Sequence, residues 1–573
     1  MHRKKLQREN LIQYSFVMAI IIALSVISSF IFTRFDLTSD KRYTLSDHTK
    51  SMLKNLDDII YFKVYLTGDL PAGFIRLENS TKELLDEFRA YGKDNIQYEF
   101  IDPAESTDQK TRNEVFRQLY EKGLDPQNLQ IREKDGSTSQ KYIIPGVIVS
   151  YRGAEWPVNI FKDQVNSSSQ GDLSSSIQAL EYEFTFAIDK LTSKEAPKIA
   201  FIQGHGELTD VQVEDMANTL SSSYHLELVY MNEYLYSLRD TLGSNKYDLI
   251  VIAKPDSVFS EKDKFIIDQF IMNGGSALWL IDQVKVEMDS LSRSRTTIAL
   301  NSDLKLDDLL FKYGVRINQD LIQDVQCAVI PVNTAMVGAK PKFAPAPWVY
   351  FPMLLPSDNH PISRNLDLIK AQFPSTIDTV GLNPKVIKSF LLASSNYSRI
   401  VNAPVRIDLG MINERLEPTR FNKQFLPVSV LLEGEFSSVF ENRIPPLISK
   451  NKDIDFKAIS KPTKMIVVSD GDIIRNHVKG VGENMQSLPL GYDRYTKQTY
   501  GNKEFLINAV NYLCNKHHLL ESRTKEHKIR LLDQTKINDE RLKWQIINVF
   551  IPILVIIGFG VLFHVMRRRK YAK

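Results

Sequence analysis

Two long apolar stretches lie near the two ends of the chain. Residues 14–33 and residues 545–565 both lack Asp, Glu, Lys and Arg. A helix rises about 1.5 Å per residue, so about 20 apolar residues suffice to cross a hydrocarbon core of roughly 30 Å. Each stretch therefore predicts a transmembrane helix. The alternative, a helix buried in a protein core, rarely contains an uncharged run of about 18 residues or more.

The first apolar stretch also has the position of a secretory signal peptide. Signal peptides have a shorter apolar region, about 7–15 residues, followed by small residues at the cleavage site. The stretch here is longer and ends with the bulky residues Phe30, Ile31 and Phe32. We therefore expect an uncleaved anchor.

Between the two spans, residues 34–165 alternate between strand and helix patterns. Because parallel strands need a crossover helix, this order predicts an α/β domain, thioredoxin-like in shape. The domain contains no Cys-x-x-Cys motif, so redox chemistry is not expected. The expected elements are a helix capped by Ser46 or Asp47, strands at 59–66 and 96–101, a turn at Gly68, Pro71 and Gly73, a helix at 78–92, and a hairpin of 142–151 and 156–162.

Residues 166–197 form the expected connection to a second domain. A polar, serine-rich loop at 166–176 leads into a helix that Pro197 ends. Apolar residues recur there at spacings of three and four, which is the helical period. They are Leu173, Ile177, Leu180, Phe184, Ile188 and Leu191.

A second α/β unit is predicted over 198–320, and it resumes at 456–518 after an insertion. Strands that alternate with helices at this spacing indicate a doubly wound parallel sheet. The proline-rich insertion, residues 321–455, is expected to be mostly β and loop. A charged stalk, residues 519–544, leads to the second span. The expected strands are 199–202, 226–230, 249–253, 277–281 and 464–469, and the helices are 209–223, 261–272 (capped by Gly274 and Gly275) and 502–515.

Basic residues flank each predicted span on the side nearer to the chain terminus. The tails 1–13 and 566–573 contain nine Lys and Arg residues and one acidic residue. Positive flanks stay in the cytoplasm, so both termini are expected there. Residues 34–544 would then lie in the periplasm, and the protein would cross the inner (cytoplasmic) membrane twice.

The charge balance narrows the possible partners. The whole chain has a net charge of +3, so the region between the tails contributes −5. A mildly acidic body argues against a nucleic-acid partner, whose phosphates need a basic face. The basic tails suit anionic inner-membrane lipids. Two cysteines, Cys327 and Cys514, provide neither a disulfide framework nor a cysteine-based metal site, and they are either bridged or free.

Polar residues follow two strands of the predicted parallel sheet. His205 and Glu207 come after the first strand, and Asp470 and Asp472 come after the last. Ligands of open α/β sheets bind beyond the carboxyl ends of the strands. These four residues are therefore candidates for a ligand site or for acid–base chemistry. The alternative is that they are tight-turn and loop residues.

Motifs for nucleotide or nucleophilic chemistry are missing from the sequence. It contains no Gly-x-Ser-x-Gly elbow, no phosphate-binding G-x-x-x-x-G-K-[ST] loop and no His-Glu-x-x-His. We therefore expect neither an enzyme nor a cofactor or metal site. The aromatic cluster of Trp348, Tyr350 and Phe351 is either a docking surface or packed under a loop.

Six stretches together resemble the gliding-motility ABC-transporter component GldG of Bacteroidetes. The resemblance covers nearly the whole chain. The stretches are Arg42-Tyr-Thr-Leu-Ser46, Phe201-Ile-Gln-Gly-His-Gly-Glu207, Val430-Leu-Leu-Glu-Gly434, Val468-Ser-Asp-Gly-Asp-Ile-Ile-Arg-Asn476, Leu490-Gly-Tyr-Asp-Arg-Tyr495 and Gly501-Asn-Lys-Glu-Phe-Leu506.

This resemblance implies an inner-membrane auxiliary subunit, often described as substrate-binding. Its implied partners are a separate ABC permease, a separate ABC ATPase and periplasmic gliding components. The second domain would resemble a glutamine amidotransferase that lacks its nucleophile, and the family supplies no catalytic residues. Two other functions stay open: a periplasmic solute-binding module, and a hydrolase that uses His205, Glu207, Asp470 and Asp472.

Overall fold

The computed structural model divides the chain into two units, residues 1–42 with 526–573 and residues 43–525. We describe each by itself. The structure describes residues 14–22, 44–105, 108–132, 138–161, 169–192, 196–286, 288–333, 342–381, 383–413, 417–444, 454–480, 485–514 and 534–571.

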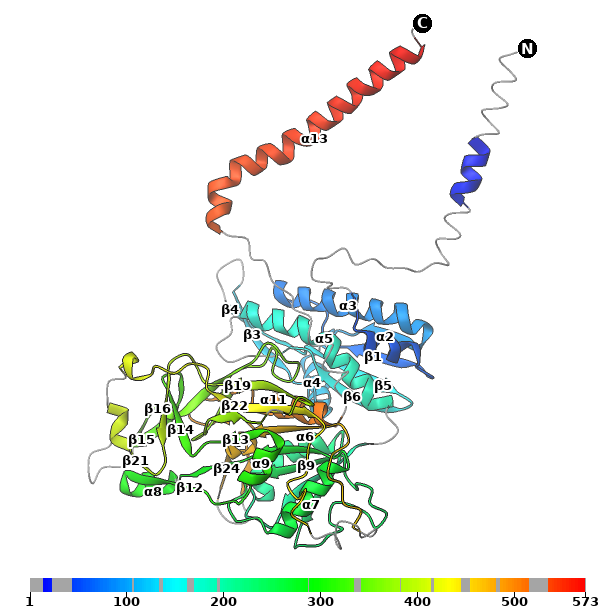
Figure 1. The fold of residues 1–573 in the computed structure, drawn as a ribbon. Coiled ribbons are helices and arrows are strands. Elements are labelled where there is room, and N and C mark those ends of the chain that lie inside the picture. Colours follow the sequence, from blue (N-terminus) through cyan, green and yellow to red (C-terminus); the bar gives the residue numbers. More distant parts are fainter. Residues whose placement is uncertain are drawn as a thin grey trace. The chain divides into compact units, whose positions relative to one another are not determined.

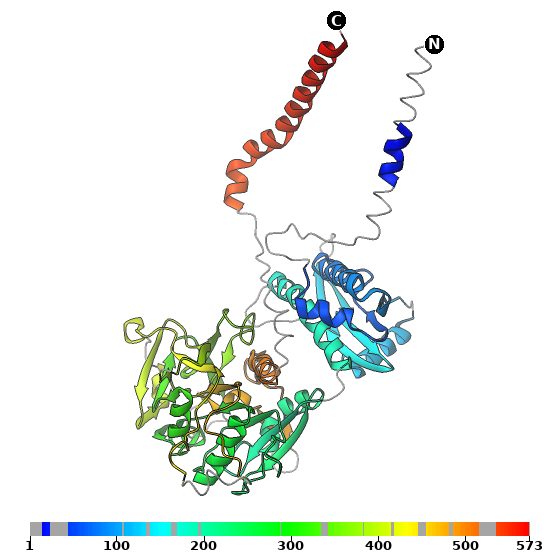
Figure 2. The same ribbon diagram turned by 45° about the vertical axis from the view of Figure 1, so that its right-hand side comes forward.

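A four-stranded sheet begins the larger unit. Its order is β2-β1-β5-β6, with β1 parallel to β2 and antiparallel to β5. Helices α3 and α5 pack side by side and contribute to the same apolar core (Figure 1, Figure 2). The elements are α2 (Asp47–Lys54), β1 (Ile60–Val64), α3 (Ala72–Gly92), β2 (Ile96–Phe100), α4 (Gln109–Glu121), β3 (Gln127–Arg132), β4 (Thr138–Ile143), β5 (Gly146–Tyr151), β6 (Ala154–Asn159) and α5 (Ser169–Thr192).

The helix start and both early strands of this region are confirmed. Ser46 is the N-cap of α2, and its side chain accepts a hydrogen bond from the Thr49 N–H. This bond satisfies one of the N–H groups that the first turn leaves without a helical partner. Strands β1 and β2 lie within the predicted ranges.

Three local predictions need correction. The strand expected at 142–151 is interrupted at Pro145, which has no N–H to donate, and is divided between β4 and β5. Strand β4 pairs with β3, and the hairpin consists of β5 and β6. Helix α3 begins at Ala72, so Gly73 lies inside it, where a Cβ would come within 2.4 Å of the Leu173 side chain. The polar loop expected up to residue 176 is already helical from Ser169, since packing against α3 overrides the weak helix propensity of serine.

A ten-stranded sheet is the main sheet in the rest of the larger unit. Five of its strands are parallel, in the order β8-β7-β9-β10-β23, and the late strand β23 does return beside β10. The parallel part consists of β7 (Lys198–Gln203), β8 (His225–Tyr230), β9 (Leu249–Ala253), β10 (Ser276–Leu280) and β23 (Thr463–Val468), with helices α6 (Asp210–Ser221), α7 (Glu261–Met272) and α11 (Asn502–Leu513).

Helices cover both faces of this parallel part. Along β9, Leu249, Val251 and Ala253 belong to one core, which also contains residues of α6 and α11. Ile250 and Ile252 point to the other core, which contains residues of α7. Because successive side chains of a strand point to opposite faces, a strand buried on both sides is apolar throughout, as β9 is.

The insertion is mostly β, as predicted, but it also extends the same sheet. Strand β22 pairs antiparallel with β23, and β19, β16 and β15 follow antiparallel, so the sheet is mixed rather than parallel. Antiparallel neighbours need no crossover helix, which is why the insertion could join the sheet without one. These strands are β15 (Cys327–Asn333), β16 (Phe343–Pro356), β17 (Ile369–Lys370), β19 (Val386–Ala393) and β22 (Pro427–Gly434).

Short elements complete the larger unit. They are β11 (Val284–Lys285), α8 (Met288–Ser294), β12 (Thr296–Asn301), α9 (Asp307–Tyr313), β13 (Val315–Ile317), β14 (Asp320–Asp324), β18 (Ile377–Thr379), β20 (Ser398–Asn402), β21 (Val405–Asp408), β24 (Val478–Lys479), β25 (Gln486–Ser487), β26 (Tyr492–Asp493) and β27 (Gln498–Thr499). The described residues also include the 3₁₀ turns η1 (Lys93–Asn95), η2 (Leu409–Asn413), η3 (Pro418–Arg420) and η4 (Gly471–Ile474).

The structure answers two questions that the sequence left open, one about the aromatic cluster and one about the cysteines. Trp348, Tyr350 and Phe351 are at most 5% exposed and lie in one apolar cluster, so they pack inside the insertion and form no docking surface. Cys327 and Cys514 do not form a disulfide with each other.

The smaller unit contains the long helix α13 (Gln534–Tyr571). Its segment Lys543–Arg569 is long and apolar enough to cross a membrane, and it includes the predicted span 545–565. Of the first predicted span, residues 14–22 are helical and the rest lie outside the described residues, so that span stays a prediction. Of the stalk, residues 534–544 belong to α13, and 519–533 lie outside the described residues.

We expect truncation of Ile466 in β23 to destabilise the protein much more than the same change in β19. Ile466 is 0% exposed and Ile387 is 66% exposed. Ile466→Ala should lower the free energy of unfolding by about 2–5 kcal/mol, because it removes buried methyl groups and leaves a cavity. Ile387→Ala should change it by less than about 0.5 kcal/mol. Chemical denaturation of the full chain in detergent measures both, and equal effects would contradict the central position of β23.

Candidate functional site

The predicted site residues follow strands of the parallel sheet at its carboxyl edge. His205 and Glu207 come after β7, and Asp470 and Asp472 come after β23. Strand order reverses at β7, which has β8 on one side and β9 on the other. Ligands of doubly wound sheets bind at such a switch point. The carboxyl ends of β7 and β9 are therefore the place where a ligand site would be expected.

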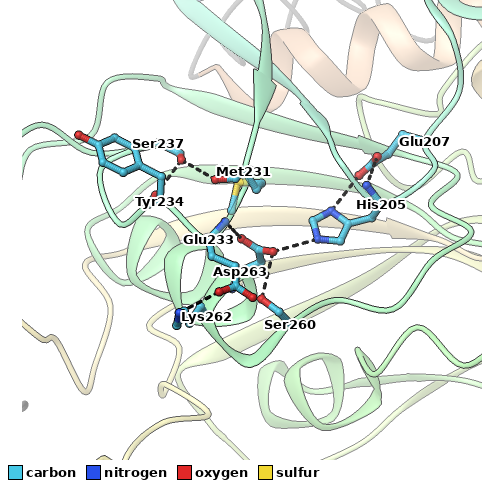
Figure 3. A network of polar contacts seen from close by, with 9 residues as sticks. All are labelled: His205, Glu207, Met231, Glu233, Tyr234, Ser237, Ser260, Lys262 and Asp263. Carbon is cyan, nitrogen blue, oxygen red and sulfur yellow. Dashed lines mark hydrogen bonds and ion pairs between the residues drawn. The ribbon is translucent and has the colours of Figure 1, made fainter.

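The His205 ring lies between two carboxylates (Figure 3). Its Nε2 is 3.2 Å from Asp263 Oδ2, and its Nδ1 is 3.3 Å from Glu207 Oε1. The ring also stacks on Phe259, with centroids 3.7 Å apart and planes inclined by 10°. His205 is only 4% exposed, so these contacts replace nearly all of its hydration.

Asp263, which the sequence analysis missed, ties this histidine to helix α7. Ser260 caps the helix by accepting from the Asp263 N–H, and its hydroxyl donates to Asp263 Oδ2 at 3.1 Å. Asp263 Oδ1 accepts from the Glu233 N–H at 3.0 Å, as Figure 3 shows. The sequence Ser260-Glu-Lys-Asp263 has the spacing of a capping motif, a signal that would have singled out Asp263.

Backbone hydrogen bonds join the two loops at the switch point. The His205 carbonyl accepts from the N–H groups of Asp256 and Ser257, at 2.9 and 3.0 Å, and the Leu208 N–H donates to the Ala253 carbonyl. Gly206 has φ +73°, and a Cβ there would come within 1.8 Å of the Asp256 side chain. The protein's own loops therefore pack closely where a doubly wound sheet would otherwise offer a crevice.

The two carboxylates decide the charge of His205. Burial works against the charged imidazolium, but hydrogen bonding and attraction from Glu207, followed by Asp263, outweigh it and raise the pKa of His205 above 6.5. The protonated ring donates from Nε2 to Asp263 and forms an ion pair with Glu207, so both carboxylates are compensated when His205 is charged.

Asp470 and Asp472 belong to a second network, centred on Lys254. Lys254 follows β9, and its ammonium group contacts Asp472 and lies 2.8 Å from Asp282, which follows β10. Asp470 is fully buried; its Oδ2 accepts from the Gln372 N–H at 2.6 Å and its Oδ1 from the Asp472 N–H at 2.8 Å. The sequence analysis missed both Lys254 and Asp282, although each is the first charged residue after an apolar strand.

Burial and charge separate the pKa values of these aspartates. Burial, helped by the charges of Asp472 and Asp282, raises the pKa of Asp470 well above 3.8. Burial also opposes ionisation of Asp472, but Lys254 and Arg475 outweigh it and lower its pKa. For Asp282, burial exceeds the effect of Lys254 and raises the pKa. Burial disfavours the charged form of Lys254 as well, yet Asp282 and Asp472 raise its pKa above 10.5.

The candidate residues therefore fall into two networks rather than one. In the described part of the chain, no hydrogen bond or ion pair joins the His205 network to the Lys254 network directly. His205, Glu207, Asp470 and Asp472 are each at most 8% exposed. Their contacts hold together the loops that follow β7, β9, β10 and β23. Whether they also bind a ligand stays a prediction.

Comparisons with known proteins match most of the chain. Residues 196–509 match a family described as "ABC-type uncharacterized transport system", and residues 39–150 match a domain of unknown function, DUF7088. An uncharacterized protein of Borreliella burgdorferi is 21% identical over 430 residues, which are 74% of this chain and 76% of the relative. The solved mmIFT52 N-terminal domain aligns with 55% of this chain and 96% of its own, at 13% identity and a TM-score of 0.30.

We expect the stability that His205 contributes to depend on pH. A pKa raised in the folded state means that protonation stabilises the fold; the contribution is complete below pH 6.5 and is lost as pH rises through the folded pKa. The difference in unfolding free energy between the wild type and His205→Gln should therefore be largest in mild acid and shrink in mild base. Denaturation across this pH range measures it, and a constant difference would refute the assigned charge.

Removal of the Lys254 ammonium group should destabilise the protein by about 3 kcal/mol, because Asp282 would lose its cation and Asp472 would keep only the contact with Arg475 among the described residues. Lys254→Met keeps most of the side-chain volume. The matched control is Lys262→Met, because the Lys262 side chain is 72% exposed and forms a surface ion pair with Glu233 at 2.8 Å. The control should cost less than about 1 kcal/mol. Thermal and chemical unfolding compare the two, and similar losses would contradict a buried ionic network.

Proposed function

Because the chain belongs to the family described as "ABC-type uncharacterized transport system", we propose that it is a non-catalytic subunit that couples a permease and an ATPase to periplasmic components. The chain is an auxiliary component of an ABC-type transport system. The family match over residues 196–509, which is more than half of the chain, is the observation that carries this proposal.

Helix α13 supports the membrane-bound part of the proposal. Its segment Lys543–Arg569 has the length and composition of a membrane span. The most apolar part of this segment is not buried against the rest of the protein. Arg567, Arg568 and Arg569 at its end suit a cytoplasmic, anionic membrane surface. Such an anchor would tether the chain to the membrane that also contains a permease.

The burial of the candidate residues supports a non-catalytic role. A general base must reach the proton that it abstracts. His205 stacks on Phe259 and contacts two carboxylates, and Asp470 accepts two backbone hydrogen bonds, so both side chains already have partners within the fold.

From the sequence resemblance to GldG we also propose that the transport system serves gliding motility.

The proposal predicts that the full chain co-purifies with its transporter. A tagged chain extracted from its own membranes in mild detergent should bring down an ABC permease and an ABC ATPase, and its deletion should abolish gliding. As a control, residues 545–565 are replaced by an unrelated apolar helix of equal length, which preserves anchoring and tests whether α13 itself contacts the permease. Recovery of the native chain without either transporter subunit would contradict the proposal.

A second measurement separates this role from a hydrolase or solute-binding module. His205→Gln and Asp472→Asn change the chemistry while nearly keeping side-chain volume. If the residues only maintain the fold, transport-dependent motility should follow the amount of protein in the membrane, as quantified by immunoblot. Loss of motility at wild-type abundance in either variant would instead support a reactive or ligand-binding centre.

A further inference from the structure

Strand β8 lies at the outer edge of the parallel half of the ten-stranded sheet. Among the described residues, β7 is the one strand that pairs with it. An edge strand has unpaired N–H and C=O groups that can bind a further strand, and many proteins protect such an edge with Pro, Lys or a bulge. Strand β8 pairs with β7 in an unbroken register and has the sequence His-Leu-Glu-Leu-Val-Tyr, without Pro or Lys. Its outer edge is therefore open to pairing.

The hydrogen bonds to β7 show which backbone groups of β8 point away from the sheet. At the start of the strand, the His225 N–H donates to the Pro197 carbonyl at 3.0 Å. Every second residue of a paired strand faces the same neighbour, so the residues at 225, 227 and 229 face β7. Among the described residues, no hydrogen bond reaches the backbone groups on the other side. The residues with these outward groups, called the outward residues below, are Leu226, Leu228 and Tyr230.

Apolar side chains accompany the unpaired backbone groups. Leu228 is 47% exposed and Tyr230 is 62% exposed. Because side chains alternate along a strand, Leu226 lies on the same face, where it packs against the core that contains α6. A strand added at this edge would pair the free backbone groups and cover exposed apolar surface at the same time.

The sequence of β8 is self-complementary in an antiparallel arrangement. A two-fold axis at Leu228 places this residue opposite Leu228 of a second copy, and it places Leu226 opposite Tyr230. Each outward residue then lies opposite another outward residue, and opposite residues of this kind exchange both backbone hydrogen bonds. On the other face of the strand, Glu227 lies opposite Val229, so like charges do not face each other.

Neighbouring registers fit less well. An axis at Glu227 would place two glutamates directly opposite each other, which is destabilising. An axis at Val229 would place Leu226 opposite Asn232, which lies beyond the end of β8. Shifts that set outward groups of one copy against inward groups of the other would form no ladder. The register centred on Leu228 therefore gives the most complete pairing.

The charge of Glu227 is already partly compensated within its own chain. Its Oε2 accepts from the Tyr247 hydroxyl at 2.5 Å, and its Oε1 lies 3.1 Å from His225 Nε2. In the proposed register the two copies of Glu227 are diagonal neighbours rather than directly opposite residues. These bonds reduce the repulsion between them.

From these features we propose that two copies of the chain associate through β8, antiparallel about a two-fold axis at Leu228. The two ten-stranded sheets then form one continuous sheet across the dimer. The pairing satisfies the backbone groups that the single chain leaves open and covers Leu228 and Tyr230. This inference goes beyond the transport role and does not depend on it.

Cross-linking of the full chain in its own membranes tests the register. With a mild oxidant, Leu228→Cys should give a covalent dimer, because opposite residues of a hydrogen-bonded pair have Cα atoms about 5.5 Å apart, within the range of a disulfide. The matched control is Tyr230→Cys in the same strand. Its two copies would lie about 14 Å apart along the paired strands and should not cross-link. The wild type, with its own two cysteines, controls for other disulfides. Absence of a dimer for Leu228→Cys, or equal cross-linking of Tyr230→Cys, would overturn the proposal.

Charge substitutions at the axis test the association without cross-linking. Leu228→Lys or Leu228→Glu alone places like charges opposite each other and should weaken dimerisation at least about tenfold. An equimolar mixture of the two variants should restore the dimer, because opposite charges then meet. Sedimentation velocity of the full chain in detergent measures the dimer. The control is Leu242→Lys, since Leu242 is 88% exposed and lies outside β8, and it should dimerise like the wild type.

The unfolding midpoint of each variant verifies that the chain still folds. Folded Leu228→Lys with unchanged dimerisation, or a mixture that stays monomeric, would refute the β8 interface. A monomeric wild type that loses a co-purified protein upon Leu228→Lys would assign this edge to another protein, and it would likewise overturn the proposal of a second copy.

Discussion

The position of β23 between β10 and β22 is the constraint on which the larger unit depends. This strand joins the parallel half of the sheet to the antiparallel insertion, and it pairs with both neighbours along its length. The connection is reinforced just past its end, where the Gly471 N–H donates to Asp282 Oδ1 at 2.6 Å over 189 positions of sequence. A Cβ at Gly471 would come within 2.5 Å of Lys254 Cβ, so glycine permits the close approach of the two loops.

The same geometry explains why so many charges are buried at one edge of the sheet. Parallel strands end at a common edge, so the first polar residues after β9, β10 and β23 are brought together. Lys254 then compensates Asp282 and Asp472, and the backbone compensates Asp470. After β7, the ring of His205 lies within ion-pair distance of the carboxylates of Glu207 and Asp263. Buried ionic networks of this kind restrict the loops to one arrangement at some cost in desolvation.

The sequence by itself determined the elements whose signal is local. The apolar run of α13, the N-cap of α2 at Ser46 and the strands that alternate with α6 and α7 follow from periodicity and capping, which depend on neighbours a few positions away. It also identified four of the residues in the two buried networks, because they follow the first and last parallel strands, at the edge where such sheets bind ligands. It did not identify Asp263, Asp282 or Lys254 as their partners.

Only the tertiary structure decided which distant groups meet. The antiparallel extension of the sheet by β22, β19, β16 and β15 depends on pairing across long separations, which no local period encodes. The helical start of α5 at Ser169 follows from packing against α3, and the burial of Trp348 follows from the core of the insertion. Local sequence sets the conformation of a segment, whereas burial and charge pairing depend on the surface that it meets.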